Sequence, residues 1–446
     1  MGRMGSSEAF SVRAFAILLA LVLSLSWPCE TAAYAVLAHE AIIDSVWDTN
    51  IRPLLLKRFP GATAEEIKEA HGYAYGGAII QDMGYYPHGS FFFSDLTHYV
   101  RSGDFVLALL RDSKDLDGYA FALGALAHYA SDTNGHPVGT NRAVPLLYPK
   151  LQKKFGDSVT YEEGELAHVK TEFGFDVVEV AHGRYAPDSY HDFIGFGVSV
   201  PLLEQAFQET YGLELKSVLS DEEKVLGSYR HDVSQLLPKA TRIAWSLKKN
   251  EIMQDQPSMT RKRFLYNLSR ASYRKNWGKN YQPPTLGENF LAFLTRIIPK
   301  IGPLKVLQLK TPTPAAERLF EASFNATLDR YRQLLNQAGA GQPDLPNDNF
   351  DTGEITGPGK YQLNDETHAK LLDALAKQHF SGASPEVRAE LLEFFGHPDA
   401  PYAMKRKAKD WAKVQSELEQ LKKAPPPVVA ENADDLSLSG RDPVVP

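Results

Sequence analysis

Cysteine is nearly absent from this 446-residue chain, which has only Cys29. That cysteine falls in a segment that reads as a secretory signal: Arg3 and Arg13, an apolar run over 14–27, and small residues ending at Ala33. The run is short for a membrane span, although an uncleaved anchor helix is the alternative. Cleavage after Ala33 would leave no thiol, so disulfides would be excluded. We therefore expect a secreted or periplasmic protein that is stabilised by core burial and not by disulfides.

An excess of positive charge is also missing, because the formal net charge is −7. A mildly acidic protein has no strong electrostatic reason to bind nucleic acid non-specifically, so we expect no stable nucleic-acid partner. The basic cluster at Lys405–Lys409 is expected to be a solvated helix face. Contact with a membrane surface or with nucleic acid is the alternative for that cluster.

The alternation typical of strands is not sustained anywhere in residues 34–249. Apolar residues recur there at helical intervals, and capping boxes occur at Thr63–Glu66 and Thr160–Glu163. Residues 115–130 are apolar on nearly all sides, which predicts a buried central helix with His128 in its last turn. The sequence therefore predicts an all-α fold with a multi-helix domain over 34–249, after a signal peptide over 1–33.

A helical C-terminal region is expected over 250–424, followed by a disordered tail over 425–446. It opens with a basic amphipathic stretch at 259–277 and contains a loop or linker rich in helix breakers at 341–360. Helices are expected over 364–380, 384–396 and 402–424, the first capped by Asn364 or Asp365 and the second by Ser384 with Pro385 in its first turn.

Histidines and carboxylates recur at intervals that suit a metal site on helices. His128 and Asp132 are spaced i, i+4, as are His168 and Glu172, so each pair would project from one helix face. Imidazole nitrogens and carboxylate oxygens are zinc ligands, and the absence of thiols favours a catalytic over a Cys-rich structural site. The full candidate set is His39, Asp82, His98, His128, Asp132, His136, His168 and Glu172.

The order of these residues resembles the zinc-dependent phospholipase C family, whose bacterial members cleave phosphatidylcholine. The related single-strand-specific zinc nucleases share the same ligand order. The resemblance covers roughly residues 34–180 and implies three zinc ions. It assigns the first to Asp82, His98, His128 and Asp132, the second to His136, His168 and Glu172, and the third to His39, Asp132 and the amine and carbonyl of Tyr34 as the mature first residue.

Further roles follow from the same resemblance. Asp132 would bridge two metals, and Asp82 would orient or deprotonate the attacking water while it ligates zinc. Clustered zinc ions would neutralise a phosphodiester transition state and lower the pKa of a water from near 16 to about 7. His136 departs from the family pattern, because it lies closer to Asp132 than is usual. Asp176, one turn beyond Glu172, would be the substitute for that glutamate, and Asp95 a weaker substitute for Asp82.

Several aromatic residues near Asp82 are candidate substrate contacts. Met83 and Asp95 stand where the classical phospholipases carry aromatic residues that recognise choline. Tyr85, Tyr86 and Phe93, with their aromatic neighbours, could rebuild a cage for a quaternary ammonium group or could simply pack the loop.

Three functions are consistent with this sequence. The first is a secreted or periplasmic zinc-dependent phosphodiester hydrolase of the phospholipase C type, which cleaves a phospholipid to diacylglycerol and a phosphorylated head group. The second is a zinc nuclease or 3′-nucleotidase, against which stand the acidic balance and the lack of disulfides. The third is a non-catalytic envelope protein stabilised by metal, which would need every coordination position filled.

Overall fold

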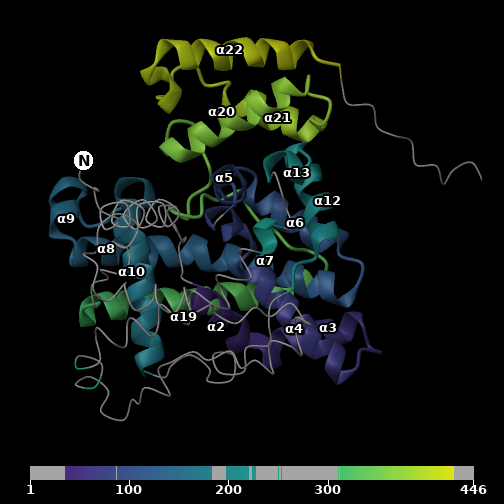
Figure 1. The fold of residues 1–446 in the computed structure, drawn as a ribbon, viewed down its shortest axis with the longest axis vertical. Coiled ribbons are helices and arrows are strands. Elements are labelled where there is room, and N and C mark those ends of the chain that lie inside the picture. The colour runs from purple at the N-terminus through teal and green to yellow at the C-terminus, as the bar shows by residue number, and fades with distance from the viewer. Residues whose placement is uncertain are drawn as a thin grey trace, which may run out of the picture.

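The computed structural model describes residues 36–86, 88–182, 197–219, 224–227, 250, 253, 310 and 312–425. These residues form helices and contain no strand, and the one β-type pairing among them is an isolated antiparallel bridge between Asp348 and Ile355 (Figure 1). The all-α prediction is therefore confirmed. The predicted signal peptide, the basic stretch at 259–277 and residues 426–446 lie outside the described residues. None of the described helices is long and apolar enough to cross a membrane.

Helices follow one another closely through the N-terminal part of the chain. In order they are α2 (Val36–Val46), the π-helix η1 (Trp47–Ile51), α3 (Arg52–Arg58), α4 (Ala64–Ala78), the 3-10 helix η2 (Ile80–Tyr85), α5 (Phe91–Tyr99), α6 (Ser102–Asp112), α7 (Leu116–Asn134), the π-helix η3 (Gly135–Thr140), α8 (Asn141–Leu147), α9 (Pro149–Phe155), α10 (Tyr161–His182), α12 (Val200–Tyr211) and α13 (Leu215–Val218). The C-terminal part contributes α19 (Pro314–Gly339), α20 (Gln362–Lys377), α21 (Pro385–Phe394), the 3-10 helix η6 (Ala403–Arg406) and α22 (Ala408–Lys423).

Helix α7 is the centre of the fold, and every residue from Gly118 to Asp132 is buried. It extends past residue 130 to Asn134, so that both His128 and Asp132 lie within it, as their i, i+4 spacing predicts. Helix α4 packs directly against α7 at Gly77, where a Cβ atom would collide with the carbonyl oxygen of Phe121. This close approach brings the end of α4 within hydrogen-bonding distance of α7.

Helix ends match the sequence signals in some places and differ in others. Thr63 and Glu66 form the predicted capping box of α4, and Ser384 caps α21 as expected. The prediction that Asn364 or Asp365 caps α20 is wrong, because this helix begins at Gln362 without a side-chain cap. Asp365 instead accepts hydrogen bonds from the backbone N–H groups of the loop before α20 and of Ala403, and so ties neighbouring turns together.

The C-terminal helices pack onto the N-terminal ones. Helix α19 lies along α7 and η3 (Figure 1), and the Tyr331 hydroxyl donates to the Leu123 carbonyl of α7 over 2.8 Å. Figure 1 also places α20, α21 and α22 together at one end of the molecule, where α20 packs against α5. An ion pair between Lys370 and Asp95, 3.3 Å apart, links these two helices.

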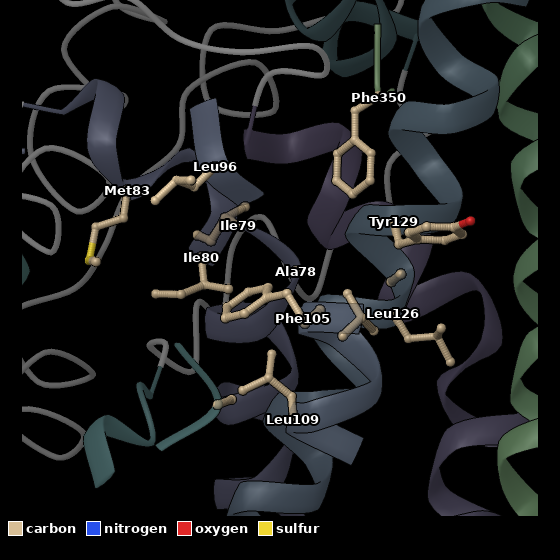
Figure 2. Close-up of a cluster of buried hydrophobic side chains, with 14 of the residues drawn as sticks. Ala78, Ile79, Ile80, Met83, Leu96, Phe105, Leu109, Leu126, Tyr129 and Phe350 are labelled. Carbon is tan, nitrogen blue, oxygen red and sulfur yellow. The ribbon is translucent and has the colours of Figure 1, made fainter. Parts of the chain in front are cut away.

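The segment from residue 341 to 361 is irregular, as the sequence predicts, but it does not hang free as a linker. Leu345 and Phe350 are buried with the main core, and Figure 2 shows the Phe350 ring directed into it beside Tyr129. The Tyr129 hydroxyl donates to the carboxylate of Asp348 over 2.8 Å, and the Ser102 hydroxyl donates to the Asp348 carbonyl over 2.6 Å. The helix breakers in this segment therefore shape a buried connection across α6 and α7. We call residues 341–361 the crossing segment.

Candidate metal centre

Side chains from four elements gather beside the second half of α7. They are His39 of α2, Asp82 of η2, His98 of α5, and His128 and Asp132 of α7, each at most 4 % exposed. Their ligand atoms fall into two overlapping groups, in each of which all atoms lie within 4.8 Å of one another: His39 with His128 and Asp132, and Asp82 with His98 and His128. The sequence predicts all five residues as ligands, and the structure brings them together although they come from separate parts of the chain.

Asp132 faces imidazoles with both of its oxygens. Its Oδ1 lies 3.7 Å from Nε2 of His39, whereas its Oδ2 lies 3.2 Å from Nε2 of His128 and 3.5 Å from Nε2 of His98. Asp82 approaches the same rings from η2, with Oδ1 3.3 Å from Nε2 of His98. This arrangement is the one expected of a carboxylate shared between two cations.

Hydrogen bonds on the far side of the rings decide which imidazole nitrogens face the group. His98 donates from Nδ1 to the Ser94 carbonyl over 2.8 Å, and His128 donates from Nδ1 to the Ala78 carbonyl at the end of α4 over 2.9 Å. Since a carbonyl can only accept, the neutral rings carry their protons on Nδ1 and turn the lone pairs of Nε2 inward. The two Nε2 atoms lie only 3.4 Å apart. Two lone pairs at that distance repel unless a proton or a metal cation lies between them.

The pKa shifts of these groups indicate how charge is balanced inside the cluster when no metal is bound. Burial alone would lower the pKa of His98, but the carboxylates of Asp132 and Asp82 raise it to about 10. Burial and the neighbouring His128 lower the pKa of His39 to about 4. Burial works against ionisation of Asp132, yet His128 and His98 hold its pKa well below the usual range. Without metal, the buried carboxylates are therefore balanced by protons held on imidazoles, and a divalent cation can take their place.

A second group lies where η3, α10 and the crossing segment meet. The ligand atoms of His136, His168 and Asp351 all lie within 4.8 Å of one another, and all three side chains are buried. Glu172, one turn after His168 on α10, has Oε1 3.5 Å from Nδ1 of that histidine. His168 also bonds through Nε2 to the Val159 carbonyl over 2.7 Å, which leaves Nδ1 as the inward lone pair. Burial raises the pKa of Glu172 to about 8, although His168 opposes this.

His136 lies just beyond α7, where the helix type changes. The chain leaves α7 at Asn134 and continues as the π-helix η3, which has a wider turn than an α-helix. The His136 ring stacks on that of His168, with the ring centroids 5.6 Å apart. The short interval from Asp132 to His136 thus accompanies a local widening of the helix, a feature found frequently at functional sites.

Asp351 is the residue of this group that no sequence pattern predicts. It belongs to no i, i+4 pair and lies far along the chain from the other members, in a stretch predicted as a loop or linker. Burial alone would raise the pKa of Asp351, but the neighbouring His136 and His168 lower it to about 2, so its carboxylate is charged at neutral pH. The one local signal was an apolar residue, Phe350, flanked by Asn349 and Asp351 among helix breakers.

Three residues that the sequence suggested as site residues or substitutes make other contacts in the structure. Phe93 is fully buried and stacks on Phe207 of α12 with the ring centroids 5.5 Å apart, so its placement favours packing over substrate contact. Asp95, the weaker substitute for Asp82, pairs with Lys370. Asp176, the substitute for Glu172, accepts a hydrogen bond from the backbone N–H of Leu37 over 3.2 Å.

The two tyrosines stay close to the first group. Tyr85 is buried with its ring edge-on to His98, 5.7 Å between centroids, and burial raises the pKa of its hydroxyl well above the usual value. Tyr86 is buried with the core. Tyr34, predicted to supply the backbone ligands of a third zinc, lies outside the described residues.

The donor set fits zinc. Among the described residues, three groups of buried His and Asp side chains could each hold a metal ion, which agrees with three zinc ions, although the first two groups share His128. Several of the inward atoms are buried without a hydrogen bond, among them Asp82 Oδ1, Asp132 Oδ2, His168 Nδ1 and both oxygens of Glu172. Buried polar atoms are rarely left in this state unless an ion or water completes them.

Comparison with known proteins agrees with this geometry. Residues 38–221 match the family model described as zinc dependent phospholipase C. No curated protein and no solved structure matches the chain. The matched range contains the predicted ligands from His39 to Glu172 and excludes Asp351. Residues 38–221 are therefore similar to the zinc-dependent phospholipase C family, and this part of the chain is a zinc-dependent phospholipase C-like hydrolase domain.

Proposed function

We propose that this protein is an exported phosphodiester hydrolase that cleaves a phospholipid to diacylglycerol and a phosphorylated head group. The observation that carries the proposal is the inward convergence of Nε2 of His98 and His128 with the carboxylates of Asp82 and Asp132, inside the range that matches the family. A phosphodiester is cleaved by water without a protein nucleophile when cations neutralise the developing charge. This group of side chains is suited to hold such cations.

The proposed ligand assignment follows the family order, with each residue at its own place in this chain. Asp82, His98, His128 and Asp132 would bind the first zinc, His136, His168 and Glu172 the second, and His39, Asp132 and the backbone of Tyr34 the third. The two inward-facing oxygens of Asp132 support its role as the shared ligand. Zinc bound there would polarise phosphoryl oxygens and lower the pKa of a water to about 7.

The protein groups would prepare the reaction in three ways. The backbone carbonyls of Ala78 and Ser94 fix the orientation of His128 and His98, so the ligands need not reorganise when substrate arrives. Asp82 lies beside His98 and is our candidate to orient the attacking water and accept its proton at a carboxylate oxygen. Tyr85 keeps its hydroxyl proton, because burial raises its pKa, and can act only as a neutral hydrogen-bonding group.

The test is a parallel hydrolysis assay with zinc on vesicles of phosphatidylcholine, vesicles of phosphatidylinositol and single-stranded DNA. We expect diacylglycerol release by the wild-type protein and a loss of about 100-fold or more in Asp82→Asn, because general-base catalysis and a metal ligand are removed together. Asp95→Asn is the matched control, since that carboxylate pairs with Lys370 on α20. Cleavage of DNA without lipid hydrolysis would favour a nuclease, and zinc binding without any hydrolysis would favour a non-catalytic envelope protein.

A further inference from the structure

We propose that Asp351 is a zinc ligand of the second group, so that the C-terminal region supplies part of the metal centre and is fastened to the hydrolase domain by the ion. This inference deepens the proposed function and rests on the same metal centre. It concerns a residue outside the range that matches the family, in a segment whose sequence reads as a linker.

The atoms that face one another in the second group are buried and lack hydrogen bonds. Oδ1 of Asp351 and Nδ1 of His136 lie 2.9 Å apart, yet both are buried without a hydrogen bond. Nδ1 of His168 and both carboxylate oxygens of Glu172 are also buried without a hydrogen bond. Five ligand atoms from three segments thus lack a hydrogen bond, and the ligand atoms of His136, His168 and Asp351 lie within 4.8 Å of one another. A cation between them would satisfy all five, whereas a simple ion pair between Asp351 and His136 would satisfy two.

Hydrogen bonds hold one carboxylate oxygen of Asp351 in place. Its other oxygen, Oδ2, accepts from the Tyr161 N–H of α10 over 2.8 Å and from the Tyr361 hydroxyl over 2.7 Å. These two bonds occupy Oδ2 and leave Oδ1 for the imidazoles. A carboxylate with one oxygen fixed by hydrogen bonds and the other directed at histidines has the outer-shell support that metal ligands usually have.

Further hydrogen bonds fix the backbone around Asp351. Its carbonyl accepts from Asn141 of α8 over 2.7 Å, and its N–H donates to the Asn349 side chain over 2.9 Å. The N–H of Phe350 donates to the carbonyl of His98 over 3.2 Å, so the crossing segment touches both candidate groups. The ring of Phe350 lies 5.1 Å from that of His98 and 5.8 Å from that of His128. The segment is therefore part of the wall of the metal centre.

The chemical consequence concerns the role of the second ion. Two imidazoles and two carboxylates make four protein donors, and a zinc ion with four protein ligands is typical of structural sites. The first group would then carry the chemistry, while the second would hold η3, α10 and the crossing segment together. Asp351 lies in the C-terminal region, outside the range that matches the family. If it binds zinc, the stability of that region would depend on zinc.

The experiment uses the full chain with Asp351→Asn and, as matched control, Asp348→Asn in the same segment. Asp348 makes the same type of hydrogen bond, to Tyr129, but belongs to neither metal group. Zinc per chain is measured after dialysis against a zinc-buffering chelator. We expect Asp351→Asn to hold one zinc fewer, or to bind it at least about 10- to 100-fold more weakly, and Asp348→Asn to match wild type. Unchanged zinc content and affinity in Asp351→Asn would overturn the proposal.

A second variant covers the case in which Asp351→Asn does not fold. Asp351→Cys, in a Cys29→Ser background, places one thiol in the whole chain, and a thiolate is itself a zinc ligand. If this position binds the ion, zinc will protect the thiol from alkylation, and removal of zinc will expose it. Equal alkylation with and without zinc would contradict the proposal.

Neither measurement involves a substrate, so the two proposals can fail separately. Loss of zinc in Asp351→Asn, combined with no lipid hydrolysis by the wild-type protein, would reject the proposed function and retain this inference. Lipid hydrolysis by the wild-type protein, combined with unchanged zinc in Asp351→Asn, would reject this inference and retain the proposed function.

Discussion

Asp132 is the residue on which the proposed centre depends most. Its two oxygens face His39 on one side and the pair His98 and His128 on the other. It is fully buried, and the neighbouring imidazoles keep its pKa well below the usual range. A permanently charged carboxylate in this position can compensate two cations at once.

Asp132→Asn should therefore impair zinc binding more than Glu172→Gln. We expect losses of about 100-fold or more in zinc affinity for the first variant and about 10-fold for the second, since Glu172 contributes to one ion only. Chelator competition on both full-length variants measures the difference. Equal affinities and equal zinc content would show that Asp132 is not shared between two ions.

Zinc affinity should rise with pH. In the metal-free protein the pKa of His98 is raised to about 10 and that of Glu172 to about 8, so both groups hold protons at pH 7 that zinc must displace. Each displaced proton weakens zinc binding about tenfold for every unit by which the pH falls below that pKa. Chelator competition at pH 6, 7 and 8 would measure this slope, and proton release on zinc addition would count the protons. An affinity independent of pH over this range would contradict these assignments.

The crossing segment is the element that couples the two parts of the chain. It meets α6 at Gly103, where a Cβ atom would overlap the carbonyl oxygens of Leu345 and Pro346. Only a residue without a side chain lets the backbones approach this closely. Asp351 lies a few residues further along the same segment, so its position depends on that contact.

Gly103→Ala should displace the crossing segment and lower stability by about 1–3 kcal/mol, the usual cost of overpacking a close contact. If Asp351 is a ligand, the same change should weaken zinc retention, which chelator competition would detect alongside the melting temperature. Gly61→Ala is the control, because a Cβ atom there meets no other atom within 4 Å. A destabilised Gly103→Ala protein with wild-type zinc affinity would separate the segment from the metal centre.

Local sequence patterns predicted where individual helices form better than they predicted which residues from distant segments come into contact. The buried helix α7, the capping box of α4 and the cap of α21 follow from short-range rules, and all three are present. The i, i+4 pairs were predicted as ligands because a helix places both side chains on one face. Asp351 follows no such rule, because its place depends on folding of the crossing segment against η3 and α10. Phe93 is the opposite case. It is close in sequence to the predicted ligands, but its ring packs against Phe207 in the core.

For the molecule as a whole, zinc should contribute to stability as well as to chemistry. The ligand atoms come from separate segments, so the binding free energy of the ions becomes part of the free energy of folding. We expect chelation to lower the melting temperature by on the order of 5–10 °C and to abolish hydrolysis, with zinc restoring both. An unchanged melting curve and full activity in excess chelator would be incompatible with the proposed centre.

Cleavage of the predicted signal peptide should determine how many zinc ions the protein binds. Tyr34, the predicted first mature residue, would offer a free amine only after cleavage, and an amine with a pKa near 7.7 to 8 gives up its proton to a metal at modest cost. We therefore expect the precursor to bind one zinc fewer and to be nearly inactive. Intact mass and metal analysis of the exported chain and its precursor would test this. A fully active, three-zinc protein that retains residues before Tyr34 would contradict it.

The central claim is that the two clusters of buried histidines and carboxylates bind zinc. Anomalous diffraction from crystals of the full chain, recorded on both sides of the zinc absorption edge, tests it most directly. We predict anomalous peaks among His39, Asp82, His98, His128 and Asp132, and a separate peak between His136, His168 and Asp351. A zinc-loaded, active protein without anomalous density at either cluster would contradict the account.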